Sequence, residues 1–535
     1  MIVKLVLKNF RKFEDATIPF EPRLNVLVGN NDSGKSTILE AIHLCLTKRW
    51  NGRYFEQVFS HHFITSAVTD AYVKEVRAGN HPKPPDLLVE LYFKDVPALA
   101  TLKGTNNSLK EDLPGYRLHA ALDTDFEQDY QEFLSEPALV STIPSEFYKI
   151  EWTSFAGQPI NPRLPKVKAS LIDASRIRLQ SGADYHLQNI IEQTLNLRQR
   201  ALLARSFRVH QEGFASDDSI NSINNALAKS GNSITKKDFT LQIDTSGSNG
   251  WESALSPHLD RLPFHFSGSG EQQKLKVLLA LNRNVGDSHV ILIEEPEAHL
   301  SFTNLNELVD RISKQSEGRQ VIVATHSSFV VNKLGLEELL LLSNGSASKL
   351  SDLPEGTQDY FKKLPGYDTL RLVLAKKVAL VEGPSDELVF QRAYIDRTGR
   401  RPIEDGVDVI SVSGLSAKRF LDLAIPLQRT AVVLTDNDGD HKTNVEKRYA
   451  PYDSYSFISI RTGQDDALQT LEPQMLQANG LSLFQKILGR SFSTDNDVLN
   501  YMERHKTDVA VAIFDTDEDL NWPTYIEEAI NDLRK

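Results

Sequence analysis

The chain has 535 residues, 40% apolar and 25% charged, so it is long enough for two to four globular domains. Its formal net charge of −12 argues mildly against a general nucleic-acid-binding surface, although residues 160–215 carry nine Lys and Arg against four acids. The single cysteine, Cys45, excludes a disulfide scaffold and a multi-cysteine zinc ribbon, and no apolar run is long enough to cross a membrane. We therefore expect a reduced, cytoplasmic location.

The first motif is a phosphate-binding loop near the N-terminus. An apolar strand-like stretch ends at Gly29, residues 29–36 read GNNDSGKS, and a helix-like pattern follows. The glycines let backbone N–H groups surround phosphate oxygens, the helix adds its positive dipole end, Lys35 neutralises phosphate and Ser36 binds Mg²⁺. This order disfavours a simple glycine-rich turn. It predicts an ATP site formed by Gly29, Asn30, Asn31, Gly34, Lys35, Ser36 and Thr37.

Three later segments carry residues suited to ATP hydrolysis. HVILIEEPEAHL, residues 289–300, predicts a strand ending in Glu294, placed to hold Mg²⁺ through water, and Glu295, placed to polarise the attacking water. QVIVATHSS, residues 320–328, predicts a strand ending at His326, which is placed to sense the γ-phosphate. Before them, a Ser/Gly turn leads into a helix and offers a second anion site without showing which serine contacts the nucleotide. That turn contains Ser267, Gly268, Ser269 and Gly270.

Taken together, these segments resemble the ATP-binding-cassette (ABC) ATPase head of RecF and SMC-type DNA-repair proteins. The resemblance implies that the Ser/Gly turn of one subunit closes over the ATP held by another. Glu294 departs from the common Asp, and SGSGEQ is not the commonest form of the turn. About 230 residues separate the loop from the turn without a coiled-coil heptad pattern, and residues 185–209 predict amphipathic helices instead.

The second half alternates strand and helix patterns after a polar stretch, which predicts a small parallel α/β domain. Parallel sheets bind ligands at the carboxyl ends of their strands, and these ends carry acids. Converging carboxylates repel unless cations neutralise them, so we predict a Mg²⁺ or Mn²⁺ site. A calcium-binding EF-hand is excluded because His441 and Lys447 stand where Gly and Glu are needed. The acids are Glu382, Asp386, with Glu387 as its alternative, Asp436, Asp438 and Glu472.

The segments VEGPSDE and DNDGD resemble the Toprim domain of topoisomerases, primases and certain nucleases. An ABC head followed by a Toprim domain is the arrangement of the OLD (overcoming lysogenisation defect) family of ATP-dependent nucleases, which includes the Gabija-type antiphage nucleases. The resemblance implies a DNA endonuclease or nickase with two metal ions, gated by the ATPase head. By position, Glu382, Asp386, Asp436, Asp438 and Glu472 would be metal ligands, and Lys506 would lie near the scissile phosphate.

The same resemblance implies DNA as substrate, a homodimer or homotetramer, and a separately encoded helicase-like or other defence-system partner. It leaves open whether ATP activates or inhibits cleavage. The alternative is a RecF/SMC-like repair ATPase without nuclease activity; a topoisomerase or a primase is disfavoured because no extra DNA-binding domain and no cysteine-rich zinc module are present. The predicted fold is α/β, with an ABC ATPase at 1–160 and 263–345, a helical, dimerising insertion at 161–262, a connector at 346–371 and a Toprim domain at 372–535.

Overall fold

The structure is a computed structural model that describes the chain except for residues 30–31, 162–164, 174–178, 181–182, 185–194, 232–250, 252–257, 282–289, 316–317, 336–337, 344–345, 350–351, 364–366 and 413–416. The predicted site residues Asn30 and Asn31, and the start of the amphipathic segment predicted at 185–209, therefore lie outside the described residues. Among the helices it does describe, none has the length and apolar character needed to span a membrane.

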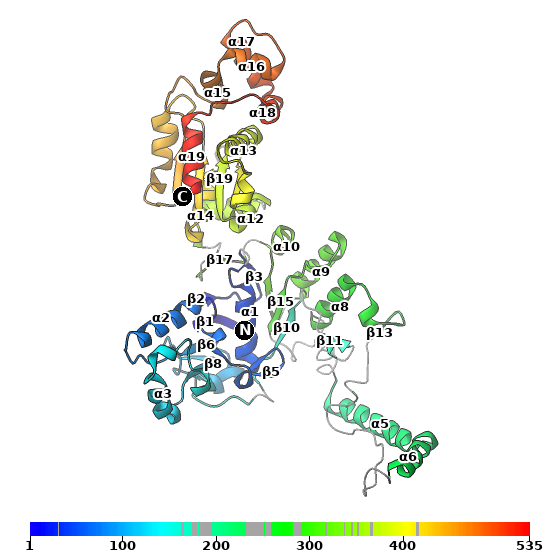
Figure 1. The fold of residues 1–535 in the computed structure, drawn as a ribbon. Helices are drawn as coiled ribbons and strands as arrows, with labels where there is room; N and C mark the ends of the chain where they lie inside the picture. The colour runs from blue at the N-terminus through cyan, green and yellow to red at the C-terminus, as the bar shows by residue number, and fades with distance from the viewer. Residues whose placement is uncertain are drawn as a thin grey trace.

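The N-terminal part is built from two sheets with a helix between them (Figure 1). The first sheet is antiparallel, with β2-β1-β6-β8-β7 in order and β9 paired to β8. Helix α1, Lys35–Thr47, buries its apolar side chains in a core shared with both sheets. The strands of the first sheet are β1 Ile2–Phe10, β2 Phe13–Pro19, β6 Leu87–Phe93, β7 Lys103–Gly104, β8 Leu113–Leu122 and β9 Tyr148–Ser154.

The second sheet carries the strands that end in the predicted ATPase residues. Its order is β10-β15-β16-β3-β17-β18, parallel except for the β17–β18 hairpin. Alternate side chains of β3 point to opposite cores, Val26 and Val28 to one and Leu27 to the core around α1, as expected for a strand buried on both faces. The strands are β3 Leu24–Val28, β10 Ala169–Asp173, β15 Val290–Glu294, β16 Gln320–Ala324, β17 Leu339–Ser343 and β18 Ser346–Lys349; helices α8 Ser269–Leu281 and α9 Phe302–Gln315 cover the face away from α1.

Two predicted boundaries are wrong in detail. Strand β10 falls inside the range predicted as a helical insertion but pairs in parallel with β15 at one edge of the second sheet, where Ile172 is buried. The range predicted as a connector contains β18 and helices α11, Glu355–Lys363, and α12, Tyr367–Leu374. Both segments are therefore parts of folded layers.

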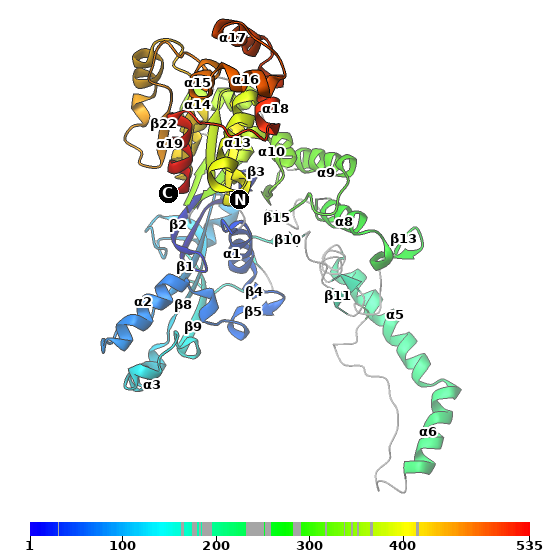
Figure 2. The same ribbon diagram turned by 45° about the horizontal axis from the view of Figure 1, so that its top comes forward.

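The described helical part of the insertion is a pair of helices, α5 Leu197–Ala215 and α6 Asp218–Gly231, that projects away from both sheets (Figures 1 and 2). Asn196 and Gln199 form a capping box that starts α5. Most described side chains of α5 are exposed, including apolar Leu202, Val209 and Phe214, so this helix does not pack into the ATPase cores.

The C-terminal part is a parallel sheet in the order β20-β19-β21-β22. Ala379 and Val381 of β19 pack with α13 and α19 on one face, while Val378 and Leu380 join the core around α14 on the other. That second core is continuous with the core of the ATPase sheet. The elements are β19 Lys377–Val381, β20 Val407–Ser411, β21 Thr430–Leu434, β22 Ile458–Arg461, α13 Pro384–Thr398, α14 Ala417–Leu427 and α19 Thr524–Arg534, with α15 Leu471–Asn479, α16 Leu481–Leu488, α17 Asp495–Arg504 and α18 Lys506–Asp515 beyond one end.

Candidate functional site

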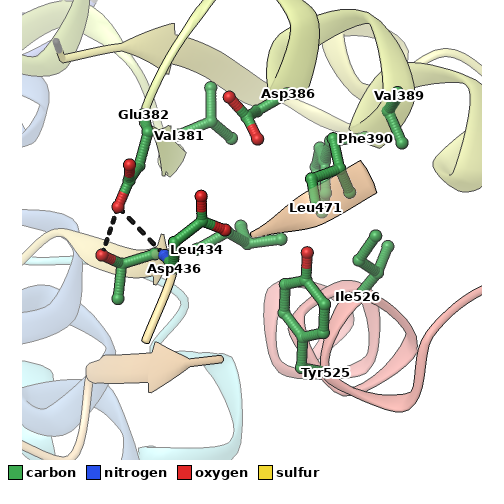
Figure 3. A pocket seen from close by; sticks show the side chains of 11 residues that line it. Val381, Glu382, Asp386, Val389, Phe390, Leu434, Asp436, Leu471, Tyr525 and Ile526 are labelled. Carbon is green, nitrogen blue, oxygen red and sulfur yellow. Dashed lines mark hydrogen bonds between the residues drawn. The ribbon is translucent and has the colours of Figure 1, made fainter. Parts of the chain in front are cut away.

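The predicted acids meet where β19 and β21 end. These strands are neighbours in parallel register, so the residues that follow them emerge at the same edge of the sheet. Glu382 follows β19 and Asp436 lies two residues beyond β21, and both line one cavity together with Asp386 (Figure 3). One carboxylate oxygen of Glu382 accepts hydrogen bonds from the Thr435 hydroxyl at 2.6 Å and from the Asp436 backbone N–H at 3.0 Å.

Asp386 stands in the first turn of α13, where its carboxylate accepts a 2.9 Å hydrogen bond from the Gly383 N–H and caps the helix. Burial and the charges of Glu382 and Glu472 raise the pKa of Asp386 to about 6. Burial and the same neighbours, with Asp386 and Asp438, raise the pKa of Asp436 to about 8. The cavity therefore concentrates negative charge that a proton or a cation must offset.

Asp438 and Glu472 do not line this cavity, but the charges of both act on Asp436. Asp438 lies in the turn after β21, has a φ of +50° and donates its N–H to the Gln469 carbonyl at 3.3 Å. Glu472 is buried in the first turn of α15, where one oxygen accepts from the Thr470 hydroxyl at 2.8 Å.

Lys506 begins α18 and places its ammonium 3.0 Å from the other oxygen of Glu472, although its side chain is half exposed. Burial lowers the pKa of Lys506, but the hydrogen bond and charge of Glu472 outweigh it and raise the pKa overall. The structure thus brings a cation to the rim of the acidic cavity.

The oxygen-only donor set fits a hard divalent cation such as Mg²⁺ or Mn²⁺. As placed, no three His, Cys, Asp or Glu side chains of the described residues form a ready-made metal cage. One oxygen of Glu382 is held by the Thr435 hydroxyl and a backbone N–H.

Sequence patterns missed two residues at this site. Asn437 is fully buried and holds the acidic turn by donating to the carbonyls of Gly463 and Asp465, both at 2.9 Å, and by accepting from the Gly439 N–H. Tyr525 of α19 lines the cavity beside Asp436. Asn437 lies inside the DNDGD segment, so its position in that motif could have identified it. No local sequence pattern identifies Tyr525.

The second site lies at the start of α1. The Lys35 ammonium donates a 2.8 Å hydrogen bond to the Gly29 carbonyl, and burial lowers the pKa of Lys35 to about 8 despite the nearby charges of Glu295, Glu294 and Glu297. Gly34 has a φ of +98°, and a Cβ there would lie 2.6 Å from the Phe13 ring, so glycine is required. Ser36 is exposed and Thr37 is buried at this helix start.

Glu294 ends β15, and Glu295 follows with a φ of +46° and donates its N–H to Ala324 at 2.8 Å. This turn directs Glu295 toward His326, whose Nε2 lies 3.6 Å from the Glu295 carboxylate. Burial and the Lys35 charge lower the pKa of His326. Lys35, Glu295 and His326 thus gather at the ends of three adjacent parallel strands, as the motif order predicts.

Glu297 is a third residue that sequence patterns missed. One of its carboxylate oxygens accepts hydrogen bonds from the Thr325 hydroxyl at 2.7 Å, the His326 N–H at 2.9 Å and the Ser327 N–H at 3.1 Å. It therefore ties the turn after β15 to the segment that carries His326. In the sequence Glu297 is the third acid of EEPE, but its hydrogen-bond partners follow a different strand, β16.

The Ser/Gly turn, Ser267–Gly270, opens α8 and packs against the segment after β15. A Cβ on Gly270 would lie 2.5 Å from the His299 carbonyl, so a side chain would not fit there. Gln273 of α8 donates to the carbonyls of Glu295 and Pro296 at 3.1 and 3.0 Å. The turn is thus fixed to the strand end that carries Glu295, and its contact with a nucleotide stays a prediction.

Known protein families match both the N-terminal and the C-terminal part of the chain. Residues 4–276, just over half of the chain, match the AAA domain family, and residues 373–438 match the Overcoming lysogenization defect protein-like TOPRIM domain. The chain is similar to Endonuclease GajA of Bacillus cereus, with 21% identity over 461 residues that cover 81% of this chain and 74% of that protein. It is also similar to DNA replication and repair protein RecF of Acetivibrio thermocellus, with 46% identity over 48 residues; that match covers 9% of this chain and spans only 13% of the RecF length.

Two solved structures are similar in part. An SmcHead bound to the C-winged helix domain of ScpA matches with a TM-score of 0.34 and 16% identity, over 65% of this chain and 96% of that chain. The C-terminal region of the Burkholderia pseudomallei OLD protein matches with a TM-score of 0.25 and 20% identity, over 30% of this chain and 97% of that chain.

Proposed function

Because this chain belongs to the AAA domain family and also carries an OLD-like TOPRIM domain, we propose that it is an ATP-hydrolysing, divalent-metal-dependent DNA endonuclease or nickase. The observation that carries the proposal is the cavity shared by Glu382, Asp386 and Asp436 at the carboxyl ends of adjacent parallel strands. The similarity to an endonuclease over most of the chain supports it further.

In this proposal the acidic cavity is the cleavage site. Divalent ions bound there would supply an activated water and stabilise the leaving oxygen of a phosphodiester. Glu382, Asp386 and Asp436 would hold the ions, with Asp438 and Glu472 as further ligands. Thr435 and the Asp436 N–H fix the Glu382 carboxylate beside the cavity. Lys506 would approach the substrate phosphate and offset the charge that develops during cleavage.

The ATPase residues would act on a nucleotide at the other sheet. Gly29, Gly34, Lys35, Ser36 and Thr37 would bind the phosphates and Mg²⁺, together with Asn30 and Asn31. Glu294 would hold the ion through water, and Glu295 would orient the attacking water beside His326. The turn Ser267–Gly270 would complete the anion site of a second subunit.

The continuous core between the two sheets supports control of cleavage by the ATPase. Strand β17 pairs with β3, which leads into the phosphate-binding loop, and it also contacts α14. Helix α14 leads directly into β21, whose end carries Asp436. We propose that nucleotide-dependent movement of the ATPase sheet reaches the cleavage site through these packed elements.

Plasmid cleavage tests the function. Supercoiled plasmid is incubated with the protein and Mg²⁺ or Mn²⁺, and relaxed or linear DNA is expected. Glu382→Ala abolishes cutting but leaves ATP hydrolysis, while Asp508→Ala, which removes an exposed acid from α18, preserves both. ATP hydrolysis without any cleavage by the wild-type protein would instead support the RecF-like repair ATPase. Residual cutting by Glu382→Ala would assign the activity to another site.

We further propose a cytoplasmic homodimer or homotetramer that acts in antiphage defence, with a separately encoded helicase-like protein as a partner. The side chains of Leu202, Val209 and Phe214 on α5 are 55–60% exposed, which supports contact between copies of this helix pair. Light scattering of the wild-type protein gives the oligomeric state, and a Leu202→Glu, Val209→Glu variant is expected to be smaller. Phage plaque counts on cells that express wild type or Glu382→Ala test the defence role.

A further inference from the structure

Tyr525 places an unpartnered hydroxyl in the acidic cavity. The residue is only 8% exposed, and its ring lies in the core formed by α13, α15 and α19. Figure 3 shows its hydroxyl directed from α19 toward the side chains of Asp436 and Asp386. Within the described part of the chain, this hydroxyl makes no hydrogen bond to another residue, which is unusual for a buried phenol.

The size of the cavity restricts its occupant. Its volume is about 10 Å³, which is room for one water molecule, and it is partly open to solvent, where a substrate would approach. Its polar lining consists of Glu382, Asp386, Thr435, Asp436 and Tyr525, and the rest is apolar. A buried water needs two to four polar partners, and the hydroxyl and two carboxylates supply three.

We propose that, in the metal-free protein, Tyr525 is a positioning residue that holds the Asp386 and Asp436 carboxylates in place through one water molecule. When both aspartates are ionised, the tyrosine hydroxyl donates to the water oxygen, and the water donates its two hydrogens to the two carboxylates. This arrangement orients two residues of the proposed metal set. The inference rests on the proposed function, because it assigns Tyr525 to the same cleavage site.

The charge around Tyr525 keeps it in the donating form. Burial and the charges of Asp436, Asp386, Glu382 and Glu472 raise the pKa of Tyr525 well above its ordinary value. This shift favours the neutral phenol. A neutral donor is the group that can lie among carboxylates without adding to their repulsion.

Tyr525→Phe tests the role, since it keeps the buried ring and removes only the hydroxyl. Titration calorimetry with Mn²⁺, without DNA or ATP, is expected to show binding about 10-fold weaker than in wild type, the usual loss when a group that orients metal ligands is removed. DNA cleavage falls by a similar factor and ATP hydrolysis is unchanged. The matched control is Tyr394→Phe, which deletes a buried hydroxyl bonded to Asp405 at 2.9 Å in the same domain and leaves Mn²⁺ affinity unchanged.

The outcomes separate this inference from the proposed function. Wild-type Mn²⁺ affinity and cleavage in Tyr525→Phe would overturn the role of Tyr525 and leave the nuclease intact. A wild-type protein that never cuts DNA would overturn the nuclease, while the Mn²⁺ titration would still report on Tyr525. A crystal structure at high resolution needs no variant: a water within hydrogen-bond reach of Tyr525 and both aspartates is expected, and a hydroxyl bonded elsewhere contradicts the proposal.

Discussion

The carboxylate of Glu297 accepts a 2.9 Å hydrogen bond from the backbone N–H of His326. The same oxygen also accepts from the Thr325 hydroxyl and the Ser327 N–H, and Ser327 in turn caps helix α10, Ser328–Leu334. The second oxygen of Glu297 is buried and has no partner among the described residues. One acid after β15 therefore sets the position of the histidine that follows β16.

Glu297→Ala is expected to lower kcat for ATP hydrolysis by about 10-fold with a smaller change in KM, because the acid holds His326 and is not assigned to the nucleotide. Loss of a hydrogen-bonded support at a catalytic residue commonly costs this much. Phosphate release at a series of ATP concentrations measures both constants.

A double-mutant cycle shows whether Glu297 acts through His326. In a His326→Ala background, Glu297→Ala should have little further effect on kcat, because the residue being positioned is already absent. Glu307→Ala, on the exposed surface of α9, is the control and should match wild type. Fully additive losses in the double variant would show that Glu297 acts independently of the histidine.

Nucleotide affinity should weaken as the pH rises through about 8. The pKa of Lys35 is lowered to about 8 by burial, so in the nucleotide-free protein this side chain is charged below that pH and neutral above it. Only the charged form attracts the phosphates. Nucleotide affinity is therefore highest well below pH 8 and declines as the pH rises above it. Titrations with a fluorescent ATP analogue from pH 6.5 to 9.5 measure the trend. Lys35→Arg stays charged over this range, and an equal decline in that variant would rule out Lys35 as the cause.

Asp436→Asn should stabilise the metal-free protein at high pH. The pKa of Asp436 is about 8 in the folded chain, against about 4 in an unfolded one. Between these values the folded state holds a proton that the unfolded state has released, so the free energy of unfolding falls as the pH rises from about 4 to 8. Above pH 8 the free energy of unfolding has lost the whole contribution of the Asp436 proton. A rise in Tm of roughly 3 °C at pH 8.5, and almost none at pH 5, is expected.

Thermal denaturation in chelator measures this difference. Asp453→Asn, which removes an exposed acid of the same domain, provides the control and should give the same Tm as wild type at both pH values. If Asp436→Asn destabilises the protein equally at pH 5 and 8.5, the acid serves folding through its contacts and not through its charge.

The sequence alone located the residues whose positions follow from their neighbours along the chain. Lys35 follows a strand and opens a helix, and Glu382 and Asp436 follow apolar strands, so chain order is enough to place them at strand ends. The parallel pairing of β19 with β21 then brings the last two together, as the strand–helix alternation predicts.

The residues that sequence missed are defined by contacts between distant segments. Tyr525 reaches Asp436 only because α19 packs across the sheet face, and no motif surrounds it. Glu297 finds its partners at the end of another strand. Strand β10 joins the ATPase sheet although it lies among residues that read as an insertion, because a five-residue strand does not reveal which sheet it will complete.

Lys506 is expected to act in cleavage and not in metal binding. Its ammonium lies 3.0 Å from Glu472 at the rim of the acidic cavity, where a half-exposed cation can meet a DNA phosphate. Lys506→Met should reduce DNA cleavage by about 100-fold, the loss typical when one group that stabilises developing charge is removed. Lys506→Arg restores part of the rate because it keeps the charge.

Removing the cation also leaves Glu472 buried without its ion pair, which lowers the free energy of unfolding in Lys506→Met. A Lys506→Met variant with a lower Tm but a wild-type cleavage rate would assign Lys506 a structural role alone.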